Sequence, residues 1–324
     1  MVLDGKKVLV TGGTGSFGQK FTEVVLRDCN PNRVIIFSRD ELKQFEMQQR
    51  FSSYGNLRFF LGDIRDRERL YRAFKDVDII IHAAALKQIP AAEYNPFEVI
   101  KTNVIGAQNI IEAAIDCEVK KVIALSTDKA ANPINLYGAT KLCSDKLFVA
   151  GNSYVGHLNT NFSVVRYGNV VGSRGSVIPF FLEQRKNGKL PITDPRMTRF
   201  WITLEQGVKF VLQCLEKMSR GEIFVPKLPS MKVVDLARAL APECEHEVVG
   251  IRPGEKLHEV MVTAEDAVHS YEFDNHYVIA PQFPWWDAQY CLKGKSLPDG
   301  FIYSSDRNDW WLSDEDLQEL AEKF

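Results

Sequence analysis

Thr11-Gly12-Gly13-Thr14-Gly15-Ser16-Phe17-Gly18 is the stretch that decides the fold, because it joins a short apolar run to an amphipathic helical pattern. Gly12, Gly15 and Gly18 are spaced three residues apart in it. Between a strand and a helix, such glycines permit a tight turn and a close approach of the backbone to a pyrophosphate. A plain glycine-rich turn is the alternative interpretation. The strand–turn–helix setting favours a dinucleotide-binding loop.

Short β-branched runs alternate with helical patterns through the first half of the chain. Continuous apolar runs of this length indicate parallel strands that are covered on both faces. The alternation predicts an α/β fold with a Rossmann-type doubly wound parallel sheet. The expected strands are Lys7–Thr11, Arg33–Ser38, Leu57–Gly62, Ile79–His82, Val122–Ser126 and Phe162–Arg166.

After Asn169 the regular alternation gives way to segments punctuated by glycine and proline. We therefore expect a Rossmann domain over 1–168 and a smaller C-terminal α/β substrate lobe over 169–283. The segment from about 199 to 226 is expected to return to the Rossmann domain. Residues 284–324 are expected to form a C-terminal tail.

Composition and charge exclude several classes of protein. The 324 residues carry a formal net charge of -2, which provides no basic field for nucleic acid. No apolar stretch reaches the roughly 18 residues of a membrane span, and the N-terminus lacks the apolar core of a signal peptide. The six cysteines and six histidines show no metal-ligand spacing. We expect a cytoplasmic protein with free thiols, no bound metal, and neither nucleic acid nor membrane as a partner.

The residues about twenty positions after the glycine turn indicate which dinucleotide is bound. Ser38, Arg39 and Lys43 can hold a ribose 2′-phosphate by charge-assisted hydrogen bonds, which favours NADP over NAD. The alternative is that Asp40 takes the ribose hydroxyl and Arg39 is merely solvated. Asp63 is placed to accept from an adenine amino group, or else to cap the helix that follows it.

Thr127, Tyr137 and Lys141 form a candidate catalytic group. Tyr137 and Lys141 are four residues apart on one face of an expected helix, so the ammonium can lie beside the phenol. A tyrosine, with an ordinary pKa of about 10, needs a nearby cation to act as a base near neutral pH. With Thr127 adding a hydrogen bond, the group can remove a proton from a carbinol while its hydride passes to nicotinamide.

The sequence resembles the extended short-chain dehydrogenase/reductases, and within them the inverting UDP-N-acetylglucosamine 4,6-dehydratases of the PseB type. Asn103 and the His82–Ala85 strand end match the wider family. The closer resemblance rests on four long runs: Ala84–Lys87, Ser126–Pro133, Arg166–Ser176 and Arg252–Lys256. Retaining dehydratases typically carry Asp-Glu after the threonine, where this chain has Asp128-Lys129. Gln88 departs from the histidine expected in close relatives, which leaves a role for that side chain in doubt.

The resemblance implies roles for Asp128 and Lys129 in losing water from the sugar. Lys129 is implied as the base that takes the C5 proton, and Asp128 as an assisting acid. For this, the pKa of Lys129 has to fall from about 10.4, through burial or neighbouring cations such as Lys141. Inversion follows if C5 is reprotonated from the opposite face. The alternative for this pair is an ordinary solvated ion pair beyond a strand.

The resemblance also implies an NADP site, a substrate site for UDP-N-acetylglucosamine, and a homo-oligomer, either hexamer or dimer. Arg199 and Arg252 are candidates for the diphosphate, Asn169 for a phosphate or the acetamido group, and Glu255 for the uridine ribose. The expected cofactor residues are Gly12, Thr14, Gly15, Ser16, Phe17, Gly18, Ser38, Arg39, Asp40, Lys43, Asp63, Ile64, Ala83, Ala84, Ala85, Thr102, Tyr137, Lys141 and Val170. The expected substrate residues are Lys87, Asn169, Ile178, Thr193, Met197, Arg199, Arg252 and Glu255.

The implied product is UDP-2-acetamido-2,6-dideoxy-β-L-arabino-hex-4-ulose, formed in the first step of pseudaminic acid biosynthesis. A retaining dehydratase or a C4 epimerase acting on UDP-sugars is the enzymatic alternative. A non-catalytic NADP-binding sensor is the alternative from another class, although such proteins typically lose the tyrosine or the lysine that this chain retains.

Overall fold

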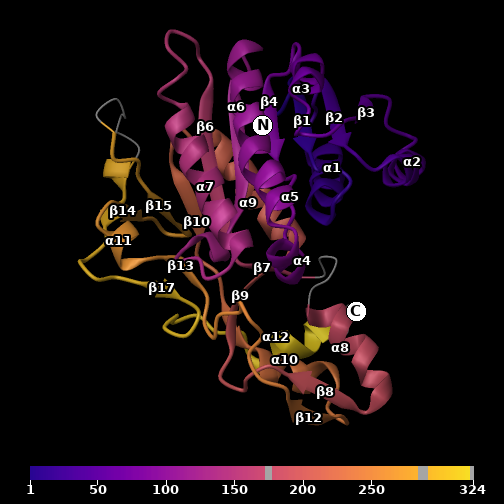
Figure 1. Ribbon diagram of the computed structural model, residues 1–324, viewed down its shortest axis with the longest axis vertical. Helices are drawn as coiled ribbons and strands as arrows, with labels where there is room; N and C mark the ends of the chain where they lie inside the picture. Colours follow the sequence, from indigo (N-terminus) through magenta and orange to yellow (C-terminus); the bar gives the residue numbers. More distant parts are fainter. Residues whose placement is uncertain (172–176, 284–290, 322–324) are drawn as a thin grey trace.

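A ten-stranded sheet forms the centre of the protein, whose computed structural model describes residues 1–171, 177–283 and 291–321 (Figure 1). Seven neighbouring strands, from β10 to β3, run parallel, and three antiparallel strands extend the sheet beyond β10. In spatial order the strands are β16 (Lys295–Ser296), β14 (Ser270–Glu272), β15 (His276–Ile279), β10 (Ile223–Pro226), β6 (Asn161–Tyr167), β5 (Lys121–Thr127), β4 (Ile79–His82), β1 (Lys7–Thr11), β2 (Arg33–Ser38) and β3 (Leu57–Leu61).

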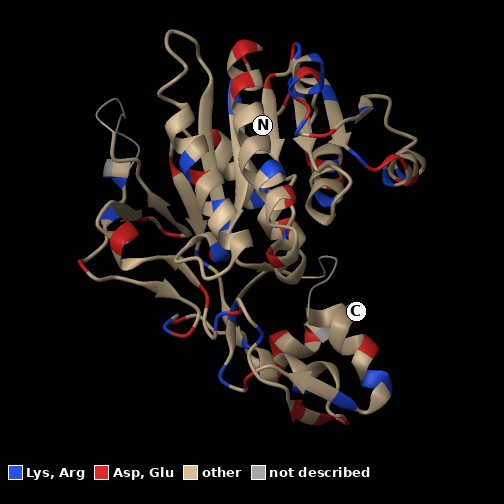
Figure 2. Ribbon diagram, viewed as in Figure 1, with Lys and Arg blue, Asp and Glu red and all other residues tan. Residues whose placement is uncertain are grey.

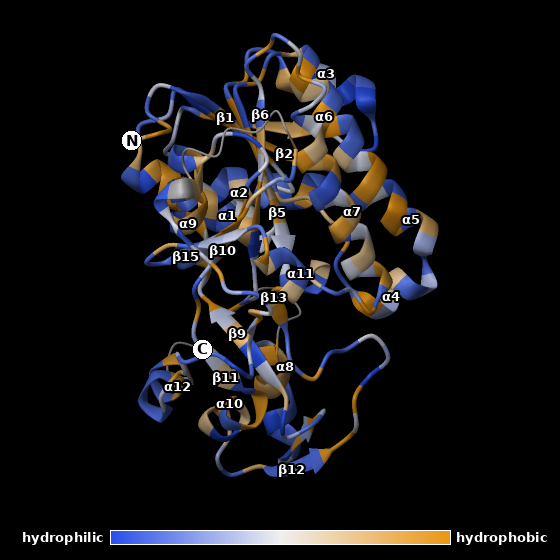
Figure 3. Ribbon diagram, turned by 90° about the vertical axis from the view of Figure 1, so that its left-hand side faces the viewer, coloured by the Kyte–Doolittle hydropathy of each residue, from blue (hydrophilic) through white to orange (hydrophobic). Residues whose placement is uncertain are grey.

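Helices cover both faces of this sheet, as its doubly apolar strands require. In Figure 3, α1 and α9 lie on one side of the strands, and α3, α6 and α7 lie on the other. The helices and helical turns of this domain are α1 (Ser16–Asp28), α2 (Glu41–Arg50), α3 (Arg67–Phe74), α4 (Ile89–Tyr94), α5 (Pro96–Ile100), the π-helical turn η1 (Lys101–Ile105), α6 (Gly106–Asp116), the 3₁₀ turn η2 (Asp128–Ala130), α7 (Leu136–Gly151), α9 (Leu204–Lys217), α11 (Ala264–Ala267) and η4 (Cys291–Lys293). The expected doubly wound α/β fold is confirmed.

A smaller lobe lies below the sheet domain in Figure 1 and has its own apolar core. Its helices are α8 (Val177–Gln184), the 3₁₀ turn η3 (Arg185–Asn187), α10 (Val233–Leu240) and α12 (Asp314–Ala321). Its strands are β7 (Asn169–Val170), β9 (Thr198–Ile202) and β11 (Ser230–Lys232) in one sheet, and β8 (Lys189–Ile192) with β12 (Glu245–Val248) in another. A further pair, β13 (Val260–Val262) and β17 (Tyr303–Ser304), lies between the lobe and the sheet domain.

The expected division at residue 283 differs from the observed strand pairing. β14 and β15 fall inside the expected lobe, yet they pair with the edge of the large sheet, where β10 offers unpaired backbone groups. The expected tail is also not separate, because Leu317 of α12 is 2% exposed within the core of the lobe. The segment after 199 is split: β9 belongs to the lobe, whereas α9 and β10 belong to the sheet domain.

Charged residues of both signs are interspersed over the outer helices and the lobe (Figure 2). Within the described ranges, no helix combines the length and the apolar character needed to cross a membrane. Described side chains also form no cluster of three or more His, Cys, Asp or Glu that is arranged to hold a metal ion.

Candidate active site

A cleft of about 780 Å³ opens where the parallel strands of the sheet domain end. It is lined by residues that follow β1, β2, β3, β4, β5 and β6, because the carboxyl ends of parallel strands meet at one edge of the sheet. All nineteen residues expected to bind the cofactor line it, together with Thr127, Asp128 and Lys129. The structure therefore brings the expected cofactor and catalytic residues together.

The glycine turn shapes one end of the cleft. Gly12 has a φ of +65°, and a Cβ atom there would lie 2.8 Å from the backbone of Ala84. Only glycine meets both conditions without strain. Gly15 caps α1 without a side chain, and the first turn of α1 carries no acidic residue. The positive end of the dipole of this thirteen-residue helix therefore lies at the cleft, where it favours an anion.

Four charged residues line the cleft beside the glycine turn, where Thr14 Oγ1 lies 2.7 Å from Ser38 Oγ. Lys43 pairs with Asp40, which also caps α2 by accepting from the Lys43 N–H. Asp63 accepts two hydrogen bonds from the Arg65 guanidinium, at 2.9 and 2.7 Å. Arg39 has only a long ion pair, 3.4 Å from Asp63, and its side chain is 52% exposed. Of these four, Arg39 is the one whose charge is least committed within the protein.

The start of α7 carries Tyr137 to the middle of the cleft. Asn135 caps α7 by accepting from the Gly138 N–H at 2.7 Å, and its amide donates to the Gly254 carbonyl at 2.7 Å. A Cβ atom at Gly138 would lie 2.2 Å from the Lys129 carbonyl oxygen, so glycine is what lets α7 approach η2 this closely. Tyr137 and Lys129 therefore line the same cleft.

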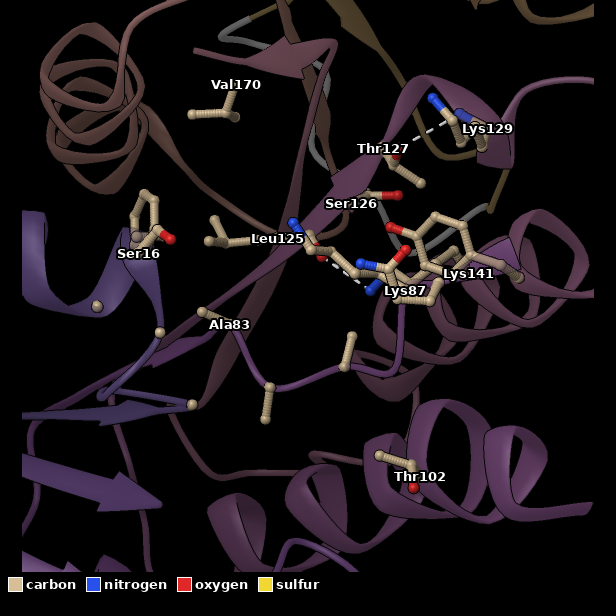
Figure 4. Close-up of a pocket in the computed structure, with 18 of the residues that line it drawn as sticks. Ser16, Ala83, Lys87, Thr102, Leu125, Ser126, Thr127, Lys129, Lys141 and Val170 are labelled. Carbon is tan, nitrogen blue, oxygen red and sulfur yellow. Dashed lines mark hydrogen bonds between the residues drawn. The ribbon is translucent and has the colours of Figure 1, made fainter. Parts of the chain in front are cut away.

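The electrostatics of Tyr137 differ from the expectation. Burial raises the pKa of Tyr137 to about 12, against the opposing effects of Lys129 and of a hydrogen bond with Thr127. The Lys141 ammonium donates to the Leu125 carbonyl at 2.8 Å (Figure 4), and burial lowers the pKa of Lys141. The cation that chiefly favours the phenolate is therefore Lys129, and burial outweighs it.

Asp128 and Lys129 are not a solvated ion pair. The Asp128 side chain is 1% exposed, and its Oδ1 lies 3.0 Å from Lys129 Nζ. Burial lowers the pKa of Lys129, but the carboxylates of Asp128 and Glu259 outweigh burial and raise it overall. This direction is opposite to the expected one, because the neighbours that count are carboxylates and not the Lys141 cation. Burial and Glu259 raise the pKa of Asp128, which favours its role as a proton donor.

Glu259 is a residue of the site that no sequence motif indicated. It is 1% exposed, and its Oε1 lies 3.0 Å from Lys129 Nζ. Glu259 lies 130 residues beyond Lys129 in the sequence, and the two meet because the fold brings the chain just before β13 against η2. Only the match of the neighbouring Arg252–Lys256 run pointed to this part of the chain.

Asn103 ties the loop after β4 to α7. Its Oδ1 accepts from the Leu86 N–H at 2.9 Å, and its Nδ2 donates to the Leu86 carbonyl at 2.9 Å and to Thr140 Oγ1 at 3.1 Å. Asn103 lies in the π-helical turn η1, a type of irregularity frequent at functional sites. This buried amide holds the middle of the 83–87 loop that lines the cleft, while Thr11 holds its start by accepting from the Ala83 and Ala84 N–H groups.

The eight expected substrate residues divide into two sets. Lys87, Asn169, Arg252 and Glu255 line the cleft. The other four, Ile178, Thr193, Met197 and Arg199, do not line it. Ile178 and Met197 are packed in the apolar core of the lobe. The Arg199 guanidinium donates to the backbone carbonyls of residues 198, 256 and 257. Residues 172–176, the end of the Arg166–Ser176 run on which the family resemblance partly rests, lie outside the described residues.

Comparison with known proteins identifies the family. The model of the family described as "Polysaccharide biosynthesis protein" matches residues 8–281. The chain is 57% identical to the UDP-N-acetylglucosamine 4,6-dehydratase (inverting) of Campylobacter jejuni subsp. jejuni serotype O:23/36 (strain 81-176), over 98% of both chains. It is 43% identical to a UDP-glucose 4-epimerase of Rickettsia akari (strain Hartford), over 85% of this chain and 82% of the relative.

Solved structures show the same architecture. Pen from Bacillus thuringiensis matches over 100% of both chains, with a TM-score of 0.90 and 36% identity. DesIV, the dTDP-glucose 4,6-dehydratase of Streptomyces venezuelae solved with NAD and TYD bound, matches over 78% of this chain and 86% of its own, with a TM-score of 0.70 and 25% identity. The resemblance found in the sequence is confirmed: the chain belongs to the polysaccharide biosynthesis protein family of extended short-chain dehydrogenase/reductases, alongside the inverting UDP-N-acetylglucosamine 4,6-dehydratases.

Proposed function

We propose that the protein is an NADP-dependent hydro-lyase that converts UDP-N-acetylglucosamine into UDP-2-acetamido-2,6-dideoxy-β-L-arabino-hex-4-ulose and water. The observation that carries the proposal is one cleft lined by two sets of groups: Thr127, Tyr137 and Lys141 for oxidation, and Asp128 and Lys129 for elimination. The 57% identity to relatives of that name supports the same reaction. The product would then enter pseudaminic acid biosynthesis.

The end of the cleft near α1 fits a nicotinamide dinucleotide. The close approach at Gly12 and the uncapped start of α1 suit a pyrophosphate, and DesIV, a relative of similar fold, was solved with NAD. NADP is favoured here because the exposed Arg39 guanidinium can pair with a 2′-phosphate, while Asp40 is engaged with Lys43. When bound, the nicotinamide would take a hydride from the sugar and return it within the same turnover.

Tyr137 and Thr127 act on the C4 hydroxyl of the sugar. Tyr137 as phenolate takes the hydroxyl proton as the C4 hydride departs, and Thr127 holds the phenol in place through their hydrogen bond. The pKa of about 12 for Tyr137 means that the phenolate is scarce near neutral pH in the protein alone. The resulting C4 ketone makes the C5 proton acidic.

Lys129 and Asp128 then remove water across C5 and C6. Neutral Lys129 takes the C5 proton, and Asp128 gives a proton to the C6 hydroxyl, which leaves as water. Burial and Glu259 raise the pKa of Asp128, which favours proton donation by that carboxyl. The hydride would be returned from the reduced cofactor to C6, and a proton that comes from solvent would be added to C5 from the opposite face, which gives the inverted 6-deoxy-4-keto sugar.

The substrate would lie against Lys87, Asn169, Arg252 and Glu255. The Arg252 guanidinium can grip phosphate oxygens bidentately. Asn169 Oδ1 and Glu255 Oε2 are buried acceptors without a hydrogen-bond partner among the described residues, as polar groups awaiting a ligand would be. These four residues support a nucleotide diphosphate-sugar as the ligand.

We further propose that the protein is cytoplasmic and forms a homo-oligomer.

Epimerisation is the second candidate function, because one relative is named as a UDP-glucose 4-epimerase. Incubation with UDP-N-acetylglucosamine in heavy water, followed by NMR, separates the candidates. A 6-methyl signal, deuterium at C5 and the L-arabino configuration support the proposal. An unchanged C6 would point to an epimerase, the opposite C5 configuration to a retaining dehydratase, and no turnover with intact NADP binding to a sensor.

A further inference from the structure

A second buried carboxylate, Glu259, lies against Lys129 and is not used by the dehydration scheme. Its Oε1 is 3.0 Å from Lys129 Nζ, and Asp128 Oδ1 is also 3.0 Å from that atom. The amine is therefore held between two carboxylates, each with a side chain only 1% exposed. Lys129 and Asp128 line the cleft, whereas Glu259 is not among the lining residues.

Glu259 is fixed by its surroundings. Its N–H donates to Ser305 Oγ at 2.9 Å, and its carbonyl accepts from the Ser305 N–H at 2.8 Å. Arg199 Nε lies 3.7 Å from its Oε1, and Arg199 is itself held by carbonyl oxygens of residues 198, 256 and 257. A residue anchored at both backbone and side chain can hold a flexible lysine in one position.

The charged groups that face Glu259 are Lys129 and Asp128 from η2, Arg199 from β9, and Lys256 from the preceding loop. Burial raises the pKa of Glu259, but Lys129 and Arg199 outweigh burial and lower it below its ordinary value. Glu259 is thus the ionised carboxylate of the cluster. Burial and Glu259 raise the pKa of Asp128, so the pKa values of the two carboxyl groups beside Lys129 are shifted in opposite directions.

We propose that Glu259 is a positioning residue for the elimination step: its carboxylate holds the Lys129 amine beside Asp128 at the cleft and sets the pH at which that amine loses its proton. The inference rests on the proposed function, in which neutral Lys129 takes the C5 proton. Each carboxylate faces Lys129 with one oxygen, and its second oxygen, Asp128 Oδ2 or Glu259 Oε2, has no hydrogen-bond partner in the described ranges. The arrangement places the amine accurately and makes it harder to deprotonate.

The test compares Glu259→Gln with Glu259→Asp by following product formation from UDP-N-acetylglucosamine between pH 6 and 10. A unit charge 3.0 Å away changes a pKa by about one unit even at the dielectric constant of water, and by more in a buried site. In Glu259→Gln the rising alkaline limb of kcat should therefore move at least about one pH unit lower. Glu259→Asp keeps the charge and should keep the position of the limb, with kcat about tenfold lower along it from imperfect placement.

A merely structural Glu259 would lower kcat by the same factor at every pH in both variants, and that outcome overturns the inference. A second readout needs no substrate. Acetic anhydride labelling, read by mass spectrometry, should modify Lys129 at a lower pH in Glu259→Gln than in the wild-type chain, because the Glu259 carboxylate lies 3.0 Å from the Lys129 amine and raises its pKa. The same pH dependence of Lys129 labelling in both proteins contradicts the inference. Absence of turnover by the wild-type chain would refute the proposed function and leave the labelling result to judge Glu259.

Discussion

Replacing Asn103 by alanine should loosen the cofactor side of the cleft. Asn103 is 2% exposed and makes three hydrogen bonds, two of them to the backbone of Leu86. The substitution leaves the Leu86 N–H and carbonyl without those partners, at about 1–3 kcal/mol for each buried group. Thr140 loses less, because its hydroxyl still donates to the Tyr137 carbonyl at 2.8 Å. The expected loss in the free energy of unfolding is about 2–4 kcal/mol.

Asn152 provides a matched control. It is 4% exposed at the far end of α7, and its side chain bonds both the N–H and the carbonyl of Phe162, at 2.9 and 3.0 Å. Asn152→Ala should also lower stability in urea unfolding, since the Phe162 N–H loses its side-chain acceptor and the carbonyls of residues 148, 149 and 162 each lose a donor, although the Gly221 N–H still donates to the Phe162 carbonyl. It should leave NADP⁺ affinity unchanged, because Asn152 does not line the cleft.

Asn103→Ala, in contrast, should weaken NADP⁺ binding by about tenfold in isothermal titration calorimetry, equivalent to about 1.4 kcal/mol. The reason is that the 83–87 loop, which lines the cleft, loses its two hydrogen bonds to Asn103 and is then held only at its start, by Thr11. If both variants lose stability and both bind NADP⁺ as the wild type does, the loop does not depend on this amide and the reasoning is refuted.

Three further predictions concern other parts of the site and of the core. Lys129→Ala should abolish water loss while NADP⁺ binding persists, because the proposed role of Lys129 is to take a proton from the sugar; unchanged turnover would remove its assigned role. Arg39→Ala should weaken NADP⁺ binding by about tenfold and leave NAD⁺ binding unchanged in parallel titrations, since only NADP⁺ offers a 2′-phosphate; equal loss for both would assign Arg39 to another contact. Burial lowers the pKa of His82 from 6.5 to about 3, so the unfolded chain binds one more proton than the folded chain between those values. Stability that is complete above pH 6.5 should therefore fall as the pH drops toward 3, and His82→Gln should make this acid slope shallower in urea titrations; an unchanged slope would show that His82 does not contribute to it.

Local sequence patterns were sufficient to predict the central strands of the sheet. The strands at Lys7–Thr11, Arg33–Ser38 and Ile79–His82 have the expected bounds, because strands buried on both faces appear as unbroken apolar runs. β14 and β16 escaped prediction because they are only three and two residues long and are defined by pairing at the sheet edge. Such pairing depends on tertiary contacts and leaves little trace in a short sequence window.

The candidate site divides in the same way. Gly12, Tyr137 and Lys141 were found because turn geometry and helix periodicity fix their spacing along the chain. Glu259 was missed because its contact with Lys129 depends on how β13 packs against η2, which no local spacing encodes. The direction of the Lys129 pKa was wrong for the same reason, since the two carboxylates that raise it become neighbours only in the fold.

The fate of the hydrogen at C4 of the sugar tests the central claim most directly. Tyr137 and Lys129 line one cleft, and if both act on one bound hexose, as we propose, the hydrogen removed from C4 is returned to C6 of the same molecule. UDP-N-acetylglucosamine deuterated at C4 should therefore give a product whose 6-methyl group carries that deuterium, read by mass spectrometry and NMR. A product with no deuterium at C6, or with deuterium still at C4, would contradict the account.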